Sequence, residues 1–368
     1  MAARSSTDQV RIAFALAGLH RVDRGAEVAF IAVASELAKM GHQITLLGSG
    51  TARVETGYRF IHVPAVARER FEAFPKFPPL RTETAWEDAT FAVGLLAKYR
   101  PSDFDVVATC AYPFTQWVLR RPPFTGTHPR SIFITQNGDW PAYSRDAEFR
   151  LFACDGLVCT NPDYYERNRT RYRCALIPNG VDLDRFAPGP AERSRFSLPE
   201  GPLVLMVSAL IASKNVAEGI AAVAKIPDAV MVVAGDGPLR AEIQQLADEL
   251  LPGRYRRLSL PAADMPALYR SADVFMHLSV DESFGNVFVE ALASGLPVVA
   301  YDTPRTRWIV GDEIHSSKSR KIEDLADAIE SALRSRKGAS DARQRAMKFG
   351  WSRIARQYAD FFERIVGD

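Results

Sequence analysis

The sequence predicts an α/β protein built from two doubly wound parallel-sheet domains of similar size. Three observations lead to this prediction. Short apolar segments alternate with amphipathic ones along the chain, which is the pattern of parallel βαβ units. The alternation occurs twice, on either side of a Pro- and Gly-rich stretch at 178–201 that is typical of a linker. The length of 368 residues also suits two domains.

The first alternation begins with the near-continuous apolar segment VRIAFALA at 10–17, which predicts a strand covered on both faces. A helix is predicted over 26–40, and Gly41 ends it. Further strands are predicted at 43–48, 58–63, 103–109, 131–136, 155–160 and 174–178. Helices are predicted at 83–99, 145–153 and 162–169, and the Pro-, Arg- and Phe-rich residues 64–81 are predicted to form an irregular loop.

The second alternation starts at Leu203 with LVLMVSAL and continues through AVMVVAG, RRLSL, DVFMHLS and LPVVAYD. Helices are predicted near 216–225, 238–250, 264–271, 284–294 and 323–335. Ligands of such sheets bind beyond the carboxyl ends of the strands, so two facing sheets predict a site in a central cleft. A helix over 351–366 has no place in the second sheet's order and is predicted to pack back on the first domain.

Composition and charge exclude several classes of protein. Apolar residues make up 47% of the chain, and 46 Lys and Arg nearly balance 44 Asp and Glu, as in ordinary globular proteins. No apolar run reaches the roughly 18 residues of a membrane-spanning helix. Residues 1–10 also lack the apolar core of a signal peptide, so a cytoplasmic location is expected. The four cysteines form no CxxC pair, so no metal is expected.

Two basic clusters are the local exceptions to the small net charge of +2, which gives no drive toward nucleic acid. The simpler interpretation is that the clusters lie on solvent-exposed helix faces and loops. The alternative is that they contact an anionic acceptor or a membrane surface. The clusters consist of Arg167, Arg169, Arg171 and Arg173, and of Arg334, Arg336, Lys337, Arg343, Arg345 and Lys348.

The segment DESFGNVFVEALASGLP at 281–297 carries the most chemical information. Ser283 is predicted to cap a helix whose dipole and first backbone N–H groups favour a phosphate. Gly285 would leave room for a close ligand. The N–H groups are those of Phe284, Gly285, Asn286 and Val287.

Two carboxylates flank this helix start. Glu282 precedes it, and Glu290 lies eight positions further on, about 80° round the helix. The spacing predicts that both line one cleft, where Glu282 accepts hydrogen bonds from sugar hydroxyls and Glu290 from a ribose diol. The alternative is a surface helix with a capping carboxylate.

Other fragments agree with a phosphate-binding site. Lys214 follows the first strand of the second half and is placed to neutralise a diphosphate. Gly235 lies in a strand-to-helix turn where glycine admits a close backbone or ligand, or it belongs to a plain turn. Gly25 and Ala26 open a helix in the first half, and Asn137 lies in the polar segment QNGDWP at 136–141, which is otherwise a loop turn.

Four motifs in order resemble those of retaining glycosyltransferases of the GT-B fold, most closely glycosyltransferase family 4. They are PNGVDLDRF (178–186), VSALIASKN (207–215), AGDGPLR (234–240) and ESFGNVFVEALASGLPVVA (282–300). The resemblance is strong over 178–312 and weak in the first half, through Gly25-Ala26-Glu27. It implies an acceptor-side domain at 1–185, a nucleotide-sugar domain at 200–345, and a helix at 346–368 that crosses back to the first domain.

The resemblance also implies roles for individual residues. Glu282 matches the carboxylate that contacts the donor sugar near its C3 and C4 hydroxyls, and Glu290 the one that holds the nucleotide ribose. Phe284 to Val287 match the phosphate-binding turn, and Lys214 the basic residue on the diphosphate. The co-substrate is then a nucleoside-diphosphate sugar, UDP- or GDP-linked, and neither cofactor nor metal is expected.

Three positions depart from the family pattern. Ala209 stands where the family has an Arg, which removes a contact of about 1.5–3 kcal/mol unless Arg305 or Arg307 replaces it. Gln136, Asn137 and Asp139 stand where the family often has a His, and the glycine-rich loop after the first strand is reduced to Gly25.

The predicted function is metal-independent, retaining transfer of a sugar to a hydroxyl acceptor, which is a glycan, a glycolipid or a small molecule. The departing phosphate or Asp139 would take the acceptor's proton. The alternatives are a nucleotide-sugar epimerase of the same fold and a non-catalytic nucleotide-sugar binder, which Ala209 motivates. No nucleic-acid partner is expected. Peripheral contact with the inner membrane face is the alternative to a purely cytoplasmic location.

Overall fold

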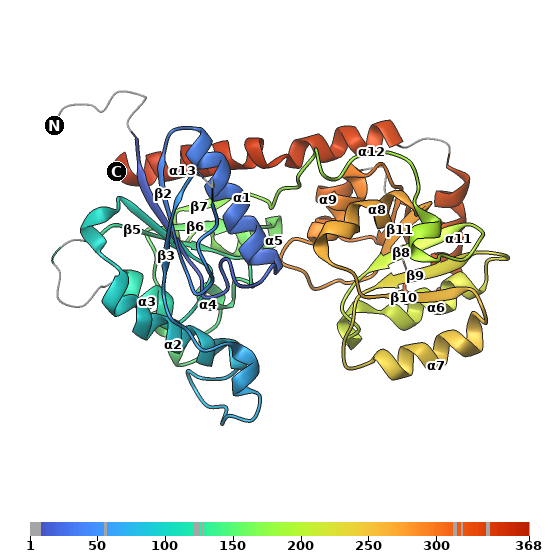
Figure 1. Cartoon of the computed structure of the whole chain (residues 1–368), viewed down its shortest axis with the longest axis horizontal. Helices are drawn as coiled ribbons and strands as arrows, with labels where there is room; N and C mark the ends of the chain where they lie inside the picture. Colours follow the sequence, from blue (N-terminus) through green and yellow to red (C-terminus); the bar gives the residue numbers. More distant parts are fainter. Residues whose placement is uncertain are drawn as a thin grey trace. The chain divides into compact units, whose positions relative to one another are not determined.

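The computed structural model describes residues 9–54, 57–120, 126, 128–311, 315–317, 319–335 and 339–367. It divides into two compact units, the first formed by Met1–Asn179 with Trp351–Asp368 and the second by Gly180–Gly350. Each unit is a parallel sheet with helices packed on it, as the alternation in the sequence predicted (Figure 1).

The first unit contains a seven-stranded sheet of order β3-β2-β1-β4-β5-β6-β7, and all its strand pairs are parallel. The strands are β1 (Arg11–Ala15), β2 (Gln43–Gly48), β3 (Arg59–His62), β4 (Val106–Thr109), β5 (Arg130–Ile134), β6 (Gly156–Cys159) and β7 (Cys174–Leu176). Its helices are α1 (Gly25–Lys39), α2 (Glu83–Lys98), α3 (Phe114–Arg120), α4 (Trp140–Tyr143), α5 (Pro162–Asn168) and α13 (Trp351–Gly367).

The alternation of side chains along β1 explains how this sheet is covered. Ile12 and Phe14 lie on the face that forms one buried cluster with α1 and α13. Ala13 and Ala15 lie on the other face, in a cluster with α2. Figure 1 shows α13, in red, beside α1, in blue, and the two helices are in direct contact.

The second unit contains a six-stranded parallel sheet of order β10-β9-β8-β11-β12-β13. The strands are β8 (Leu203–Val207), β9 (Val230–Ala234), β10 (Tyr255–Leu258), β11 (Val274–His277), β12 (Val298–Tyr301) and β13 (His315–Ser317). Its helices are α6 (Val216–Ala224), α7 (Arg240–Leu250), α8 (Met265–Arg270), α9 (Asn286–Ala293), α10 (Pro304–Val310), α11 (Ile322–Arg334) and α12 (Ala339–Ala346).

Several details differ from the sequence prediction. The prediction of a helix over 145–153 is wrong, because this stretch contains only a short 3-10 turn at Glu148–Leu151. Helices α3, α4, α10 and α12 and strand β13 were not predicted. The predicted linker is not a free connection either: Val181, Phe186, Phe196 and Leu198 are buried in the core of the second unit. The first unit accordingly ends at Asn179, before the predicted limit of 185.

Two residues of the second basic cluster are part of the fold. Arg343 donates to the backbone oxygens of Leu183, Phe186 and Ala293, and Arg345 donates to those of Trp308 and Ile309. Arg336 and Lys337 lie outside the described residues. No helix in the described ranges is long and apolar enough to cross a membrane.

We expect the packing of α13 to be an important source of stability for the first unit. Phe362 is fully buried, with its ring 6.2 Å from that of Phe14. Phe362→Ala should lower the free energy of unfolding by about 3–5 kcal/mol, because it leaves a cavity under the helix. The exposed Arg356 on the same helix gives the control, since Arg356→Ala should change it by about 0.5 kcal/mol or less. Urea unfolding of both variants measures the difference, and equal stabilities would contradict the expectation.

Candidate functional site

The loops that leave β8 and β11 bring together the two charged residues predicted to act on the donor. Strands β8 and β11 are neighbours at the centre of the second sheet, where the strand order reverses. Ligands of doubly wound sheets bind at this point, beyond the carboxyl ends of the strands. Lys214 ends a 3-10 turn at Ala212–Lys214 after β8, and Glu282 lies in the loop after β11.

Lys214 and Glu282 form a largely buried ion pair. The Lys214 ammonium contacts Oε1 of Glu282, and these side chains are 18% and 21% exposed. His277, the last residue of β11, lies with Nε2 3.1 Å from the same oxygen. Burial raises the pKa of this carboxyl, but the hydrogen bonds and charge interactions of His277 and then of Lys214 outweigh it and lower the pKa to about 2. Glu282 is therefore a carboxylate at neutral pH.

The backbone around Glu282 is also held. Arg305, near the start of α10, donates to the backbone oxygen of Glu282 and lies 3.5 Å from that of Val280. Arg305 was predicted to replace the Arg missing at Ala209. In the structure it contacts the loop that carries Glu282. Arg307, the other predicted replacement, forms a bidentate pair with Asp302.

The start of α9 differs from the prediction. Ser283 is not the N-cap: the helix begins at Asn286, and Gly285 occupies the cap position with a φ of 97°. A Cβ at Gly285 would lie 2.8 Å from the Phe288 ring, so backbone conformation and packing both require glycine here. Phe284 is a core residue whose ring contacts that of Trp308. Asn286 and Val287 form the first turn of the helix, and the cap residue Gly285 has no side chain that could cap it.

Glu290 lies within α9 and faces α8. Its Oε2 accepts a hydrogen bond from the Tyr269 hydroxyl at 2.8 Å. Burial raises the pKa of Glu290, and the hydrogen bond and the charge of Arg185 oppose this effect. Because Glu282 precedes the helix, the 80° helical spacing predicted between the two carboxylates does not apply.

The packing of two loops explains why residue 235 is a glycine. A Cβ there would lie 1.9 Å from the backbone oxygen of Ser208, so the loops after β8 and β9 pack directly on each other. Two backbone hydrogen bonds, from Ser208 to Ala234 and from Leu210 to Asp236, join the same loops. Of its two sequence interpretations, close approach of backbone is the one observed.

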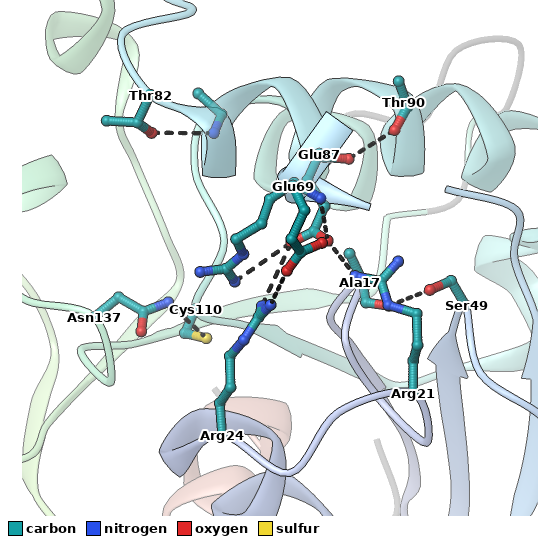
Figure 2. A network of polar contacts seen from close by, with 12 residues as sticks. Ala17, Arg21, Arg24, Ser49, Glu69, Thr82, Glu87, Thr90, Cys110 and Asn137 are labelled. Carbon is teal, nitrogen blue, oxygen red and sulfur yellow. Dashed lines mark hydrogen bonds and ion pairs between the residues drawn. The ribbon is translucent and has the colours of Figure 1, made fainter. Parts of the chain in front are cut away.

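In the first unit, Gly25 and Ala26 form the first turn of α1, the helix that follows β1 at the corresponding reversal between β1 and β4. Arg24 is the N-cap residue and makes no capping hydrogen bond. Its guanidinium instead lies 3.2 Å from Glu69 and 3.7 Å from Glu87. Figure 2 shows Arg21 and Arg24 converging on the buried Glu87 carboxylate.

The side chains of the polar segment after β5 are bonded to other segments of the first unit. Both oxygens of Asp139 accept from Arg167, at 3.0 and 3.2 Å, and Oδ2 also accepts from Asn168 at 3.1 Å. Asn137 lies with Nδ2 3.6 Å from the Cys110 sulfur (Figure 2). Gln136 is paired with Asn179 through both amide groups.

Two site residues, His277 and Tyr269, were missed by the sequence reasoning. The sequence contains one indication for His277. It lies two positions after Phe275 on β11, so both side chains point to the face that α9 covers, and it lies five residues before Glu282. Tyr269 lies 21 positions before Glu290 on another helix, and no spacing rule connects them.

The ion pair predicts a pH-dependent stability. At about pH 6.5, Glu282→Gln should lower the free energy of unfolding by about 3 kcal/mol, because Lys214 loses its partner. The folded-state pKa of Glu282 is depressed from 4.5 to about 2, so this contribution is full above pH 4.5 and disappears as the pH falls toward 2. The stability gap between the variant and the wild type should therefore narrow below pH 4.5.

Thermal or urea unfolding across this pH range measures the gap. Glu330→Gln is the control, since its 2.8 Å pair with Arg334 lies at the surface and should contribute about 0.5 kcal/mol or less. A gap for Glu282→Gln that stays constant down to pH 3 would contradict the assignment.

Comparison with known proteins identifies the family. Residues 24–185 match the model of Glycosyltransferase Family 4, and residues 191–349 match that of Glycosyl transferases group 1. D-inositol 3-phosphate glycosyltransferase of Mycobacterium marinum is 32% identical, over 94% of this chain and 82% of its own length. Some other relatives are matched over 36% to 45% of their length.

Solved structures agree on the fold. Sucrose-phosphate synthase from Thermosynechococcus elongatus has a TM-score of 0.77 at 21% identity and covers 98% of this chain and 100% of its own. HepE from Anabaena, solved with UDP and glucose, has a TM-score of 0.71 at 17% identity and covers 97% and 100%. The chain thus belongs to the glycosyltransferases of family 4, with the GT-B fold.

Proposed function

We propose that this glycosyltransferase moves a hexose from a nucleoside-diphosphate sugar to an acceptor hydroxyl, with retention of the anomeric configuration and without a metal ion. The observation that carries the proposal is the Lys214–Glu282 pair at the reversal point of the second sheet. A cation for the diphosphate and a carboxylate for the sugar hydroxyls lie side by side there, and the loop of Glu282 leads into the first turn of α9.

The proposal assigns the donor to the second unit. Lys214 and the start of α9 neutralise the diphosphate as the sugar–phosphate bond breaks, which replaces the charge that a metal ion would supply. Glu282 accepts hydrogen bonds from the sugar, and Glu290 accepts them from the ribose. Arg305 keeps the loop of Glu282 in place. A UDP-linked donor has the support of HepE, solved with UDP and glucose, and a GDP-linked donor remains the other candidate.

The transfer itself is proposed as a front-face displacement. The bond from sugar C1 to the phosphate oxygen breaks, and the bond from C1 to the acceptor oxygen forms on the same face. The acceptor's proton passes to the departing phosphate. Asp139 is the alternative proton acceptor, but both its oxygens already accept from Arg167, so the phosphate is preferred.

The acceptor is assigned to the first unit, around residues 64–81 and 112–124, of which 121–124 lie outside the described residues. Glycans, lipid-linked sugars and small molecules are the classes to screen. The enzyme is proposed to work in the cytoplasm, with peripheral contact at the inner membrane face if the acceptor is a lipid.

Lys214→Ala tests the donor site. We expect the affinity for the preferred nucleoside diphosphate to fall about 10- to 100-fold, the range for a lost charge-assisted contact. The preferred ligand is found first by thermal shift across nucleoside diphosphates, with and without EDTA, since a ligand at about 100 times its Kd adds about 2.7 kcal/mol. Lys225→Ala is the control, because Lys225 pairs with Glu323 on the surface. Equal affinities for both variants would rule out this role, and an EDTA-sensitive shift would rule out metal independence.

Glu282→Gln separates the transferase from a non-catalytic binder. We expect kcat to fall on the order of 100-fold, while the Kd for the nucleoside diphosphate stays within a few-fold, because the carboxylate acts on the sugar rather than on the phosphates. Radiolabelled transfer and NMR of the product's anomeric proton give rate and configuration. An inverted product would exclude retention. An epimerised free sugar without an acceptor would favour the epimerase, and no turnover by the wild type would favour the binder.

A further inference from the structure

His277 is a buried polar residue at the end of a strand that otherwise carries apolar side chains. It is 2% exposed. Its ring is stacked near Phe275, with centroids 6.3 Å apart and planes at 9°, and meets the edge of Phe288 at 5.0 Å. The two phenylalanines belong to the core of the second unit and fix the plane of the imidazole.

The hydrogen-bonding geometry specifies how His277 acts on its neighbour. Nε2 lies 3.1 Å from Oε1 of Glu282, whereas Nδ1 is buried and has no hydrogen-bond partner among the described residues. A proton on Nδ1 alone would leave a buried donor unsatisfied and would turn two lone pairs toward each other at Nε2. Nε2 is therefore the nitrogen that carries a proton toward Glu282, and it donates this N–H to the carboxylate.

Lys214 holds the same oxygen of Glu282 in a different way. Its ammonium is carried by a flexible four-carbon chain and lies 3.4 Å from the Ser279 hydroxyl as well. In the proposed function the diphosphate attracts this ammonium. Glu282 would then lose its cation partner inside a mostly buried site, which is costly for an unpaired charge.

We propose that His277 is a positioning residue that keeps Glu282 oriented toward the donor sugar when Lys214 turns to the diphosphate. The inference rests on the proposed function. A rigid donor that stays behind preserves one hydrogen bond to the carboxylate and fixes which oxygen lone pairs face the sugar. Arg305 donates to the backbone oxygen of Glu282, and this contact does not orient the carboxylate.

Two substitutions separate the N–H donor from the packing of the ring. His277→Phe keeps a flat ring between Phe275 and Phe288 but removes the donor, and His277→Gln keeps an N–H near the position of Nε2. We expect His277→Phe to lower kcat 10- to 100-fold with the Kd for the nucleoside diphosphate unchanged within two-fold, and His277→Gln to recover kcat to within about five-fold of the wild type. Wild-type kcat for His277→Phe, or an equal loss in both variants, would overturn the proposal while leaving the transferase function intact.

A second measurement does not depend on turnover. Lys214→Met imitates the state in which the ammonium has left Glu282. We expect His277→Phe to lower the Tm by more in the Lys214→Met background than in the wild-type background, and His277→Gln to lower it little in either. A Tm loss that is no larger in the Lys214→Met background would overturn the positioning role. Absence of transfer by the wild type with every donor would instead overturn the proposed function, and the Tm comparison would still decide the role of His277.

Discussion

Parallel pairing of the strands is the constraint on which both units depend. Because all strands of a sheet run in one direction, their carboxyl ends lie along one edge, and the central strands are buried on both faces. Polar chemistry is then confined to the loops that leave this edge and to the last residues of the strands. In the second unit, the reversal between β8 and β11 separates the two outgoing loops and makes room for Lys214 and Glu282 between them.

Elements long enough to show a period could be predicted from the sequence. Helix α13 has 17 residues with an apolar stripe, and β8 is buried almost throughout, so both patterns are plain. Four-residue α4 and three-residue β13 are too short for any period to appear. The breakers between 178 and 201 indicated a linker, but proline and glycine act on the backbone alone, which proline restricts and glycine frees. They leave Phe186 and Phe196 free to pack, and these rings decide which unit the segment joins.

The candidate site shows the same division. Its charged residues could be named in advance, because carboxylates and a lysine after apolar strands stand out, and because the segment 282–300 resembles a known family. Their partners could not. The Tyr269–Glu290 hydrogen bond joins two helices, and His277 reaches Glu282 only because the loop turns back over the strand end. Ser283 was the better cap by residue type, but the positive φ at Gly285 and the ring of Phe288 determine where α9 begins.

Helix α13 ties the first unit to a part of the chain that is made much later. Residues 180–350, which lie between Asn179 and α13, form a compact unit of their own. At about 5–20 residues per second, a ribosome needs roughly 10–30 s to synthesise these 171 residues. During that time the surface of α1 and β1 that α13 will cover is without this helix. The first unit is therefore completed only after the whole of the second unit has been made, although most of its residues come first in the chain.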